Sequence, residues 1–221
     1  MFMLVPKTNI NVGGRPCGKP AGLGYPFLLI ITFLSGLPPT FSMNRNRLVI
    51  TAAMLAALSL ALEFVPTIKM GVIDLDIVGV PWLISTFVLG LGGGLVTSAI
   101  AAIGIALLTP SGWIGAVMKL LATLPLVLAV GIAKWKFGMG KVSLGTAFCV
   151  GALARVLGML ALNYYWAIPL FTGLTFEQGI AQFPPEMIII PNFILACVDF
   201  FGAYVLVTST RLKERVDAFS R

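Results

Sequence analysis

The stretch DLDIVGVPWLISTFVLGLGGGLV, residues 74–96, decides the fold of this chain. After two acidic residues it has no charged residue, and it ends in four glycines between Gly90 and Gly94. A long apolar run is typical of a membrane helix, whereas clustered glycines disfavour a continuous helix. We therefore predict two short helices that form a tight hairpin at the glycines. One long kinked helix over the same residues is the alternative.

Similar apolar runs fill most of the remaining sequence. The chain is 58% hydrophobic and only 10% charged, which is unlike a soluble domain. About 20 mostly apolar residues are needed to cross the hydrocarbon core of a bilayer. The predicted fold class is therefore an all-α integral membrane protein, with six transmembrane helices in a compact bundle. The predicted spans are residues 47–66, 77–93, 95–110, 113–133, 144–169 and 187–210.

The connections between these spans alternate in the sign of their charge. The segment before the first span, the connection 134–141 and the C-terminal tail are basic, whereas the opposite side is mainly acidic apart from Lys69. The positive-inside rule then places both termini in the cytoplasm of a multi-pass cell-membrane protein. The basic residues are Arg45, Arg47, Lys134, Lys136, Lys141, Arg211, Lys213, Arg215 and Arg221, and the acidic ones are Asp74, Asp76, Glu177 and Glu186.

The first 42 residues differ from the rest in composition. They are rich in glycine and proline, and their apolar run from Phe27 to Leu34 is too short to span a bilayer. At Met43 the stretch MNRNRLVITAAML begins with a basic flank and continues into the first span. We divide the chain into a leader, 1–42, that is disordered or a start-site artefact, and a membrane domain, 43–221. A signal peptide is the alternative for the leader.

The sequence offers few groups for catalysis or metal binding. It has no histidine, and Cys17, Cys149 and Cys197 form no recognisable framework. Phosphate loops and CxxC motifs are also absent. We predict a protein that is not an enzyme, holds no metal or cofactor and does not hydrolyse ATP by itself. Its net charge of +7 suits a cytoplasmic fringe beside anionic lipids and requires no nucleic-acid partner.

Three charged residues fall inside apolar runs: Lys119, Arg155 and Asp199. A charge at membrane depth costs roughly 2.5–3.5 kcal/mol on insertion scales, so such groups face the protein interior, a cavity or a partner. One interpretation is that Asp199 neutralises Arg155 or Lys119 inside the bundle. The other interpretation is a polar ligand site or a coupling contact.

The first span contains small residues spaced four positions apart, in the stretch AAMLAALSLAL, residues 52–62. Such a stripe lets another helix approach closely. It indicates docking to another membrane subunit, although alanine is also common in membrane helices generally. The stripe consists of Ala52, Ala53, Ala56, Ala57 and Ala61.

Together these segments resemble the substrate-binding (S) components of energy-coupling-factor (ECF) vitamin transporters, most closely the riboflavin-specific members. The resemblance covers Met43 to about Arg215 and follows the family's order. Besides the alanine-rich first span and residues 74–96, it rests on NYYWAIPLF (163–171) and on IIPNFILACV (189–198).

The resemblance implies a bundle that captures a vitamin at its outer face. Transport would require a separate membrane coupling subunit, which docks on the alanine stripe, and two ATPase subunits. The loop 69–76 would line or cover the pocket. An interfacial aromatic belt is the alternative role for Tyr164, Tyr165 and Trp166. The implied ligand-binding residues are Asp74, Asp76, Lys119, Asn163, Tyr164, Pro169 and Asn192.

The sequence departs from the riboflavin-specific pattern in two places. Leu195 stands where those members are expected to have a lysine, and the segment SGWIGAVMKLLATLP, 111–125, is also changed. Two interpretations are open: Lys119 supplies the missing cation from another helix, or the ligand is a different vitamin. Riboflavin is the first choice of ligand. A stand-alone secondary transporter and a structural membrane protein are the alternative functions.

Overall fold

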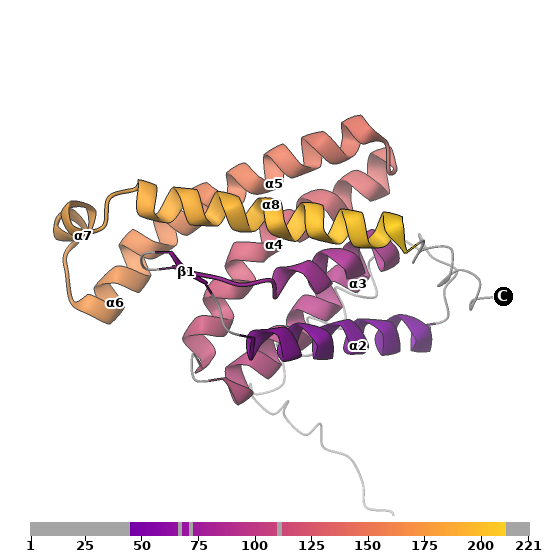
Figure 1. Cartoon of the computed structure of the whole chain (residues 1–221), viewed down its shortest axis with the longest axis horizontal. Coiled ribbons are helices and arrows are strands. Elements are labelled where there is room, and N and C mark those ends of the chain that lie inside the picture. Colours follow the sequence, from indigo (N-terminus) through magenta and orange to yellow (C-terminus); the bar gives the residue numbers. More distant parts are fainter. Residues whose placement is uncertain (1–44, 66–67, 71–72, 110–111, 211–221) are drawn as a thin grey trace, which may run out of the picture. The chain divides into compact units, whose positions relative to one another are not determined.

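The computed structural model describes residues 45–65, 68–70, 73–109 and 112–210, and nearly all of them are helical (Figure 1). The predicted leader and the basic C-terminal tail lie outside the described residues. A short antiparallel strand pair, which we did not predict, interrupts the all-helical pattern in the connection after the first helix. The elements are α2 (Arg45–Glu63), β1 (Ile68–Met70), β2 (Ile73–Leu75), α3 (Gly79–Leu108), α4 (Gly112–Phe137), α5 (Lys141–Leu162), η1 (Asn163–Ala167), α6 (Ile168–Thr172), α7 (Phe176–Gln182) and α8 (Glu186–Ser209).

Helix α3 is broken at the glycine cluster. Gly90 has φ of 83° and ψ of −169°, a backbone conformation that essentially only glycine adopts. The hydroxyls of Ser85 and Thr97 are hydrogen-bonded at 2.7 Å across this break. A continuous helix would separate them by about 18 Å, since it rises 1.5 Å per residue. The two halves of α3 therefore pack side by side, which confirms the predicted hairpin and excludes one long helix.

The hairpin is tight because Gly94 has no side chain. A Cβ atom at this position would collide with the Thr86 side chain on the other half of the hairpin. Lys134 of α4 donates hydrogen bonds to the carbonyls of Phe87 (2.6 Å) and Val88 (3.1 Å). Because a helix end leaves its last carbonyls unpaired, these bonds stabilise the end of the first half of α3.

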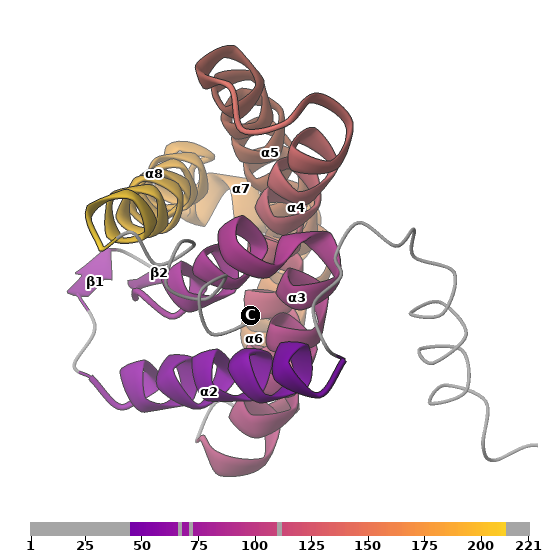
Figure 2. The ribbon, with the colours of Figure 1, turned by 90° about the vertical axis from the view of Figure 1, so that its right-hand side faces the viewer.

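The core of the described helices lies around α3. Helix α2 runs beside it, as both views show (Figures 1 and 2), and α4 and α8 also contact it. The largest fully buried side chains include Trp82, Phe87 and Leu83. Trp82 donates from Nε1 to the Ser59 hydroxyl at 2.7 Å, and Ser59 in turn donates to the carbonyl of Val78 at 2.9 Å. These bonds join α2 to the start of α3.

Within the described part of the chain, four helices are long and apolar enough to cross a membrane, and Leu48–Glu63 is a shorter apolar helix. The four are Gly79–Leu108, Gly112–Phe137, Lys141–Thr172 and Glu186–Ser209. This agrees with a helical membrane protein. Because the first of the four is folded into a hairpin, its halves are each shorter than the roughly 20 residues that span a bilayer. The count of six spans and the cytoplasmic position of both termini stay predictions.

The helix that begins at Lys141 continues through a π-helical turn into α6. This turn, η1, is formed by the NYYWA part of the motif at 163–171. Single π-turns insert one extra residue in a helix and are frequent at functional sites. Gly173, with φ of 70°, ends α6, and the short helix α7 leads on to α8.

Candidate functional site

A buried ion pair joins α5 to α8. Arg155 Nη1 lies 2.7 Å from Asp199 Oδ2. Arg155 is 3% exposed and Asp199 is 1% exposed. Of the two partners that the sequence offered for Asp199, the structure selects Arg155.

Lys119 is instead held by two other carboxylates. Its Nζ lies 2.5 Å from Glu63 Oε2 and also contacts Asp76 Oδ2. The second oxygen of Asp76 accepts a hydrogen bond from the Val78 amide at 3.2 Å. Lys119 therefore ties α4 to the end of α2 and to the segment that precedes α3. Glu63 was absent from the predicted site, although an acidic residue at the end of an apolar helix was a signal for it.

These two groups of charges form one charged cluster, which consists of Glu63, Asp76, Lys119, Arg155 and Asp199. Asp199 lies within electrostatic range of both Asp76 and Lys119. Three carboxylates face two cations in this cluster, which leaves one negative charge in excess when all five are ionised. An excess negative charge favours a ligand that presents hydrogen-bond donors or positive charge.

Two buried asparagines lie further along the same two helices. Asn163 is 8% exposed and Asn192 is 1% exposed. Figure 1 shows α8 running antiparallel beside α5. At a rise of 1.5 Å per residue, Asn163, the first residue of η1, lies about 12 Å beyond Arg155 along the continuous helix that begins at Lys141. Asn192 lies about 10 Å from Asp199 toward the start of α8. The two amides therefore lie at a similar level on adjacent helices.

Each of these asparagines uses one of its two side-chain N–H groups within its own helix and retains its Oδ1 as an acceptor. Asn163 Nδ2 donates to the carbonyl of Met159 at 2.7 Å, and Asn192 Nδ2 donates to that of Ile188 at 2.8 Å. Each bond reaches back one helical turn and fixes the side chain against its own helix. An amide oxygen accepts hydrogen bonds, so the pair can bind donor groups of a ligand.

The aromatic residues of the motif at 163–171 divide between two environments. Tyr164 is buried, and its hydroxyl donates to the carbonyl of Phe183 at 2.6 Å. Tyr165 is 73% exposed and stacks on Phe176 with ring centroids 4.9 Å apart. Tyr164 thus belongs to the packing beneath α7, whereas Tyr165 has the exposure expected of a belt residue.

The other predicted ligand residues are less informative. Pro169 is half-buried in the first turn of α6. Asp74 lies in β2, opposite Lys69 in the backbone register of the strand pair. The structure therefore brings Asp76 and Lys119 together and sets Asn163 level with Asn192, but it does not gather the whole predicted set at one point.

The alanine stripe is split between two faces of α2. Ala52 and Ala56 are fully buried, and Thr97 of α3 lies 3.4 Å from the Ala52 carbonyl. Ala53 is half-buried, whereas Ala57 and Ala61 are exposed. Two of the five alanines therefore pack inside this chain, and the row Ala53, Ala57 and Ala61 is accessible to another protein.

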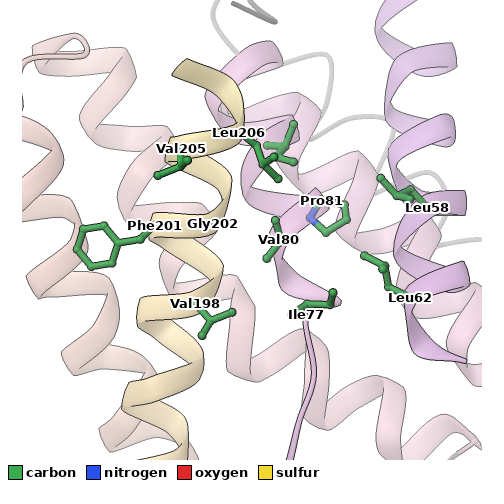
Figure 3. A pocket seen from close by; sticks show the side chains of 11 residues that line it. Leu58, Leu62, Ile77, Val80, Pro81, Val198, Phe201, Gly202, Val205 and Leu206 are labelled. Atoms are coloured by element: carbon green, nitrogen blue, oxygen red, sulfur yellow. The ribbon is translucent and has the colours of Figure 1, made fainter. Parts of the chain in front are cut away.

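An apolar groove of about 650 Å³ lies between α2, the start of α3 and α8. Figure 3 shows Leu58 and Leu62 of α2 facing Val205 and Leu206 of α8, with Pro81 between them. None of the predicted ligand residues lines the groove. An apolar lining does not suit a ligand with many hydrogen-bonding groups, so we separate this groove from the polar site.

Comparison with known proteins relates this chain to one family of transporters. The family model described as "ECF transporter, substrate-specific component" matches residues 47–210. The riboflavin transporter RibU of Lactococcus lactis subsp. cremoris, from strains NZ9000 and MG1363, is 34% identical over 141 residues. The match covers 58% of this chain and 66% of each relative, so the chain spans just under two thirds of the length of these curated relatives.

A solved structure shares the fold. It is described as "Structure and mechanism of the S component of a bacterial ECF transporter". It superposes with a TM-score of 0.63 at 22% sequence identity, over 76% of this chain and 97% of the other.

Proposed function

The chain belongs to the family of substrate-specific components of ECF transporters, and on this premise we propose that it is a vitamin-binding subunit whose ligand is riboflavin. The observation that carries the proposal is the pair of buried amides, Asn163 and Asn192, set level on adjacent helices. The similarity to proteins named as riboflavin transporters supports the choice of vitamin. The chain would bind its ligand and release it for transport, without chemical conversion.

The proposed ligand site lies between α4, α5 with η1, α8 and the segment around Asp76. Riboflavin combines a flat apolar ring with a ring edge and a ribityl chain that both form hydrogen bonds. The oxygens of Asn163 and Asn192 would accept from the ligand's hydroxyl or N–H groups. Tyr164 and Pro169 would shape the outer end of the site, and Asp74 would border it from β2.

Lys119 has a different role in this proposal from the one that the sequence suggested. Its ammonium group is engaged by Glu63 and Asp76, so it is a poor substitute for the lysine that Leu195 replaces. We propose that Lys119 contributes to binding by holding Asp76 and the start of α3 against α4. The ligand would then be recognised mainly by the neutral amides of Asn163 and Asn192 and by the buried charges near them.

The proposed assembly includes a membrane coupling subunit and two ATPase subunits. Their docking surface on this chain would be the accessible row Ala53, Ala57 and Ala61, because small residues allow close helix approach. In this proposal the chain has six spans with both termini in the cytoplasm. Reporter fusions after residues 72, 139 and 221 should then report outside, inside and inside. An extracellular C-terminus would exclude this topology.

A vitamin panel tests the proposed function. The purified full chain is incubated with equal concentrations of riboflavin, thiamine, biotin, folate and pantothenate, washed, and analysed by mass spectrometry for retained ligand. We expect riboflavin alone to be retained. Retention of another vitamin would overturn the choice of ligand, and retention of none by folded protein would overturn the binding function itself.

A further inference from the structure

The buried pair Arg155–Asp199 leaves two polar atoms unpaired. Among the described residues, Arg155 Nε and Asp199 Oδ1 are buried and have no hydrogen-bond partner. The first atom is a donor and the second an acceptor. An unpaired buried polar group carries the full penalty of its lost hydration, so two of them in one ion pair require an explanation.

A purely structural role explains this arrangement poorly. A buried ion pair can often be replaced by apolar residues of similar volume without loss of stability. Joining α5 to α8 would therefore not by itself require a charged pair with unsatisfied atoms. A ligand that supplies one acceptor and one donor would satisfy both atoms and offset their cost.

The Arg155–Asp199 pair joins α5 to α8, two of the helices between which the proposed ligand site lies. Asn163, at the start of η1, and Asn192 of α8 lie about 10–12 Å from the pair along the same two stretches of helix. Asp199 also lies within electrostatic range of Asp76 and Lys119. Gly79, the first residue of α3, packs directly on the Asp199 carboxylate, since a Cβ atom at this position would collide with it. The carboxylate is therefore close to the segment around Asp76 that borders the site.

From this geometry we propose that Arg155 and Asp199 form the inner end of the ligand site and bind an imide edge of the ligand. This inference rests on the proposed function, because the riboflavin ring has such an edge, with an N3–H group between two carbonyl groups. Asp199 Oδ1 accepts a hydrogen bond from N3–H, and Arg155 Nε donates one to a carbonyl oxygen. The excess negative charge of the charged cluster favours the N–H donor at this position.

A pair of ligands tests this contact directly. N3-methylriboflavin has the ring and ribityl chain of riboflavin but lacks the N3–H donor. Titration of each flavin with the purified full chain, followed by flavin fluorescence, gives both affinities. We expect methylation to weaken binding by about 5- to 150-fold, which corresponds to one lost hydrogen bond in a buried site.

Two variants locate the effect on these residues. The double variant Arg155→Met, Asp199→Leu replaces both charges with apolar side chains. It should bind riboflavin more weakly and should no longer distinguish the two flavins. The control Asn163→Ala should weaken both flavins by the same factor and keep the methylation effect. If the double variant does not fold, Arg155→Met with Asp199→Ala gives the same comparison, because neither replacement side chain can accept from N3–H.

Different outcomes separate this inference from the proposed function. Equal affinity of the wild-type protein for both flavins overturns the inference while leaving riboflavin binding intact. A methylation effect that persists in the folded Arg155 and Asp199 variants also overturns it. Binding of neither flavin by folded wild-type protein overturns the proposed function, and this inference with it.

Discussion

The hydroxyls of Ser85 and Thr97 lie 2.7 Å apart, although the two residues are 12 positions apart in the sequence. This hydrogen bond closes the hairpin that Gly90 opens. It sets the first half of α3, which carries the fully buried Trp82 and Phe87, in the interior of the described helices. The start of that half-helix is Gly79, which contacts Asp199, so the hairpin also positions one border of the proposed site.

A methyl group at Gly94 should disrupt the hairpin. In Gly94→Ala the added Cβ collides with Thr86, and we expect a loss of about 1–3 kcal/mol of stability from overpacking. Thermal unfolding of the purified protein in detergent measures the effect. Gly145→Ala is the matched control, because a Cβ atom there meets nothing within 4 Å. Equal stability of the two variants would contradict the tight approach at Gly94.

Removal of the Lys119 charge should destabilise the protein whether or not ligand is present. Lys119→Met leaves Glu63 and Asp76 as neighbouring carboxylates without their cation. Because all three side chains are partly exposed, we expect a loss of about 1–3 kcal/mol, below the value for a fully buried pair. Thermal unfolding with and without saturating riboflavin measures this loss.

The triple variant Lys119→Met, Glu63→Gln, Asp76→Asn provides the control for Lys119. It removes the two carboxylates that would otherwise repel each other, so it should recover part of the lost stability. A single variant of unchanged stability but strongly reduced riboflavin affinity would show instead that Lys119 binds the ligand directly.

The two rows of alanines should respond differently to enlargement. Ala53→Leu with Ala57→Leu adds bulk on the accessible row, so uptake with the complete transporter should fail while riboflavin binding by the isolated chain persists. Ala52→Leu with Ala56→Leu adds the same bulk inside the packing of α2 on α3 and should lower the unfolding temperature. Loss of riboflavin binding in the first variant would assign the accessible row to internal packing.

Truncation of one buried amide should weaken binding without unfolding the protein. Asn192→Ala removes the oxygen proposed to bind riboflavin, and we expect an affinity loss of about 5- to 150-fold. Fluorescence titration gives the affinity, and thermal unfolding of the same preparation provides the control for folding. A folded Asn192→Ala variant with wild-type affinity would remove this residue from the proposed site.

Local features predicted the hairpin, and they offered an ion pair as one of two interpretations of Asp199. Clustered glycines break a helix by their own backbone preferences, so the break at Gly90 could be recognised without knowledge of the neighbours. A lone charge is costly in an apolar span, so Asp199 was expected to need a partner. The choice of Arg155 over Lys119 depends on how α4, α5 and α8 are placed around it, which the sequence alone does not specify.

Features set by packing between distant segments could not be predicted. The carboxylates that hold Lys119 are 56 and 43 residues away in the sequence. The four-residue spacing identified small residues on α2, but adjacent rows of one helix share that spacing. Only the position of α3 shows that Ala52 and Ala56 face inward. The strands β1 and β2 have three residues each, too short to produce a recognisable alternating pattern.

Titration of riboflavin with the purified, folded chain tests the central claim most directly. The free flavin is fluorescent, and a flavin held in a protein site beside aromatic and polar groups is expected to be quenched. We predict saturable quenching at micromolar or lower protein concentration, with one flavin bound per chain. Absence of quenching by micromolar protein, with folding verified on the same sample, would contradict the assignment of riboflavin as the ligand.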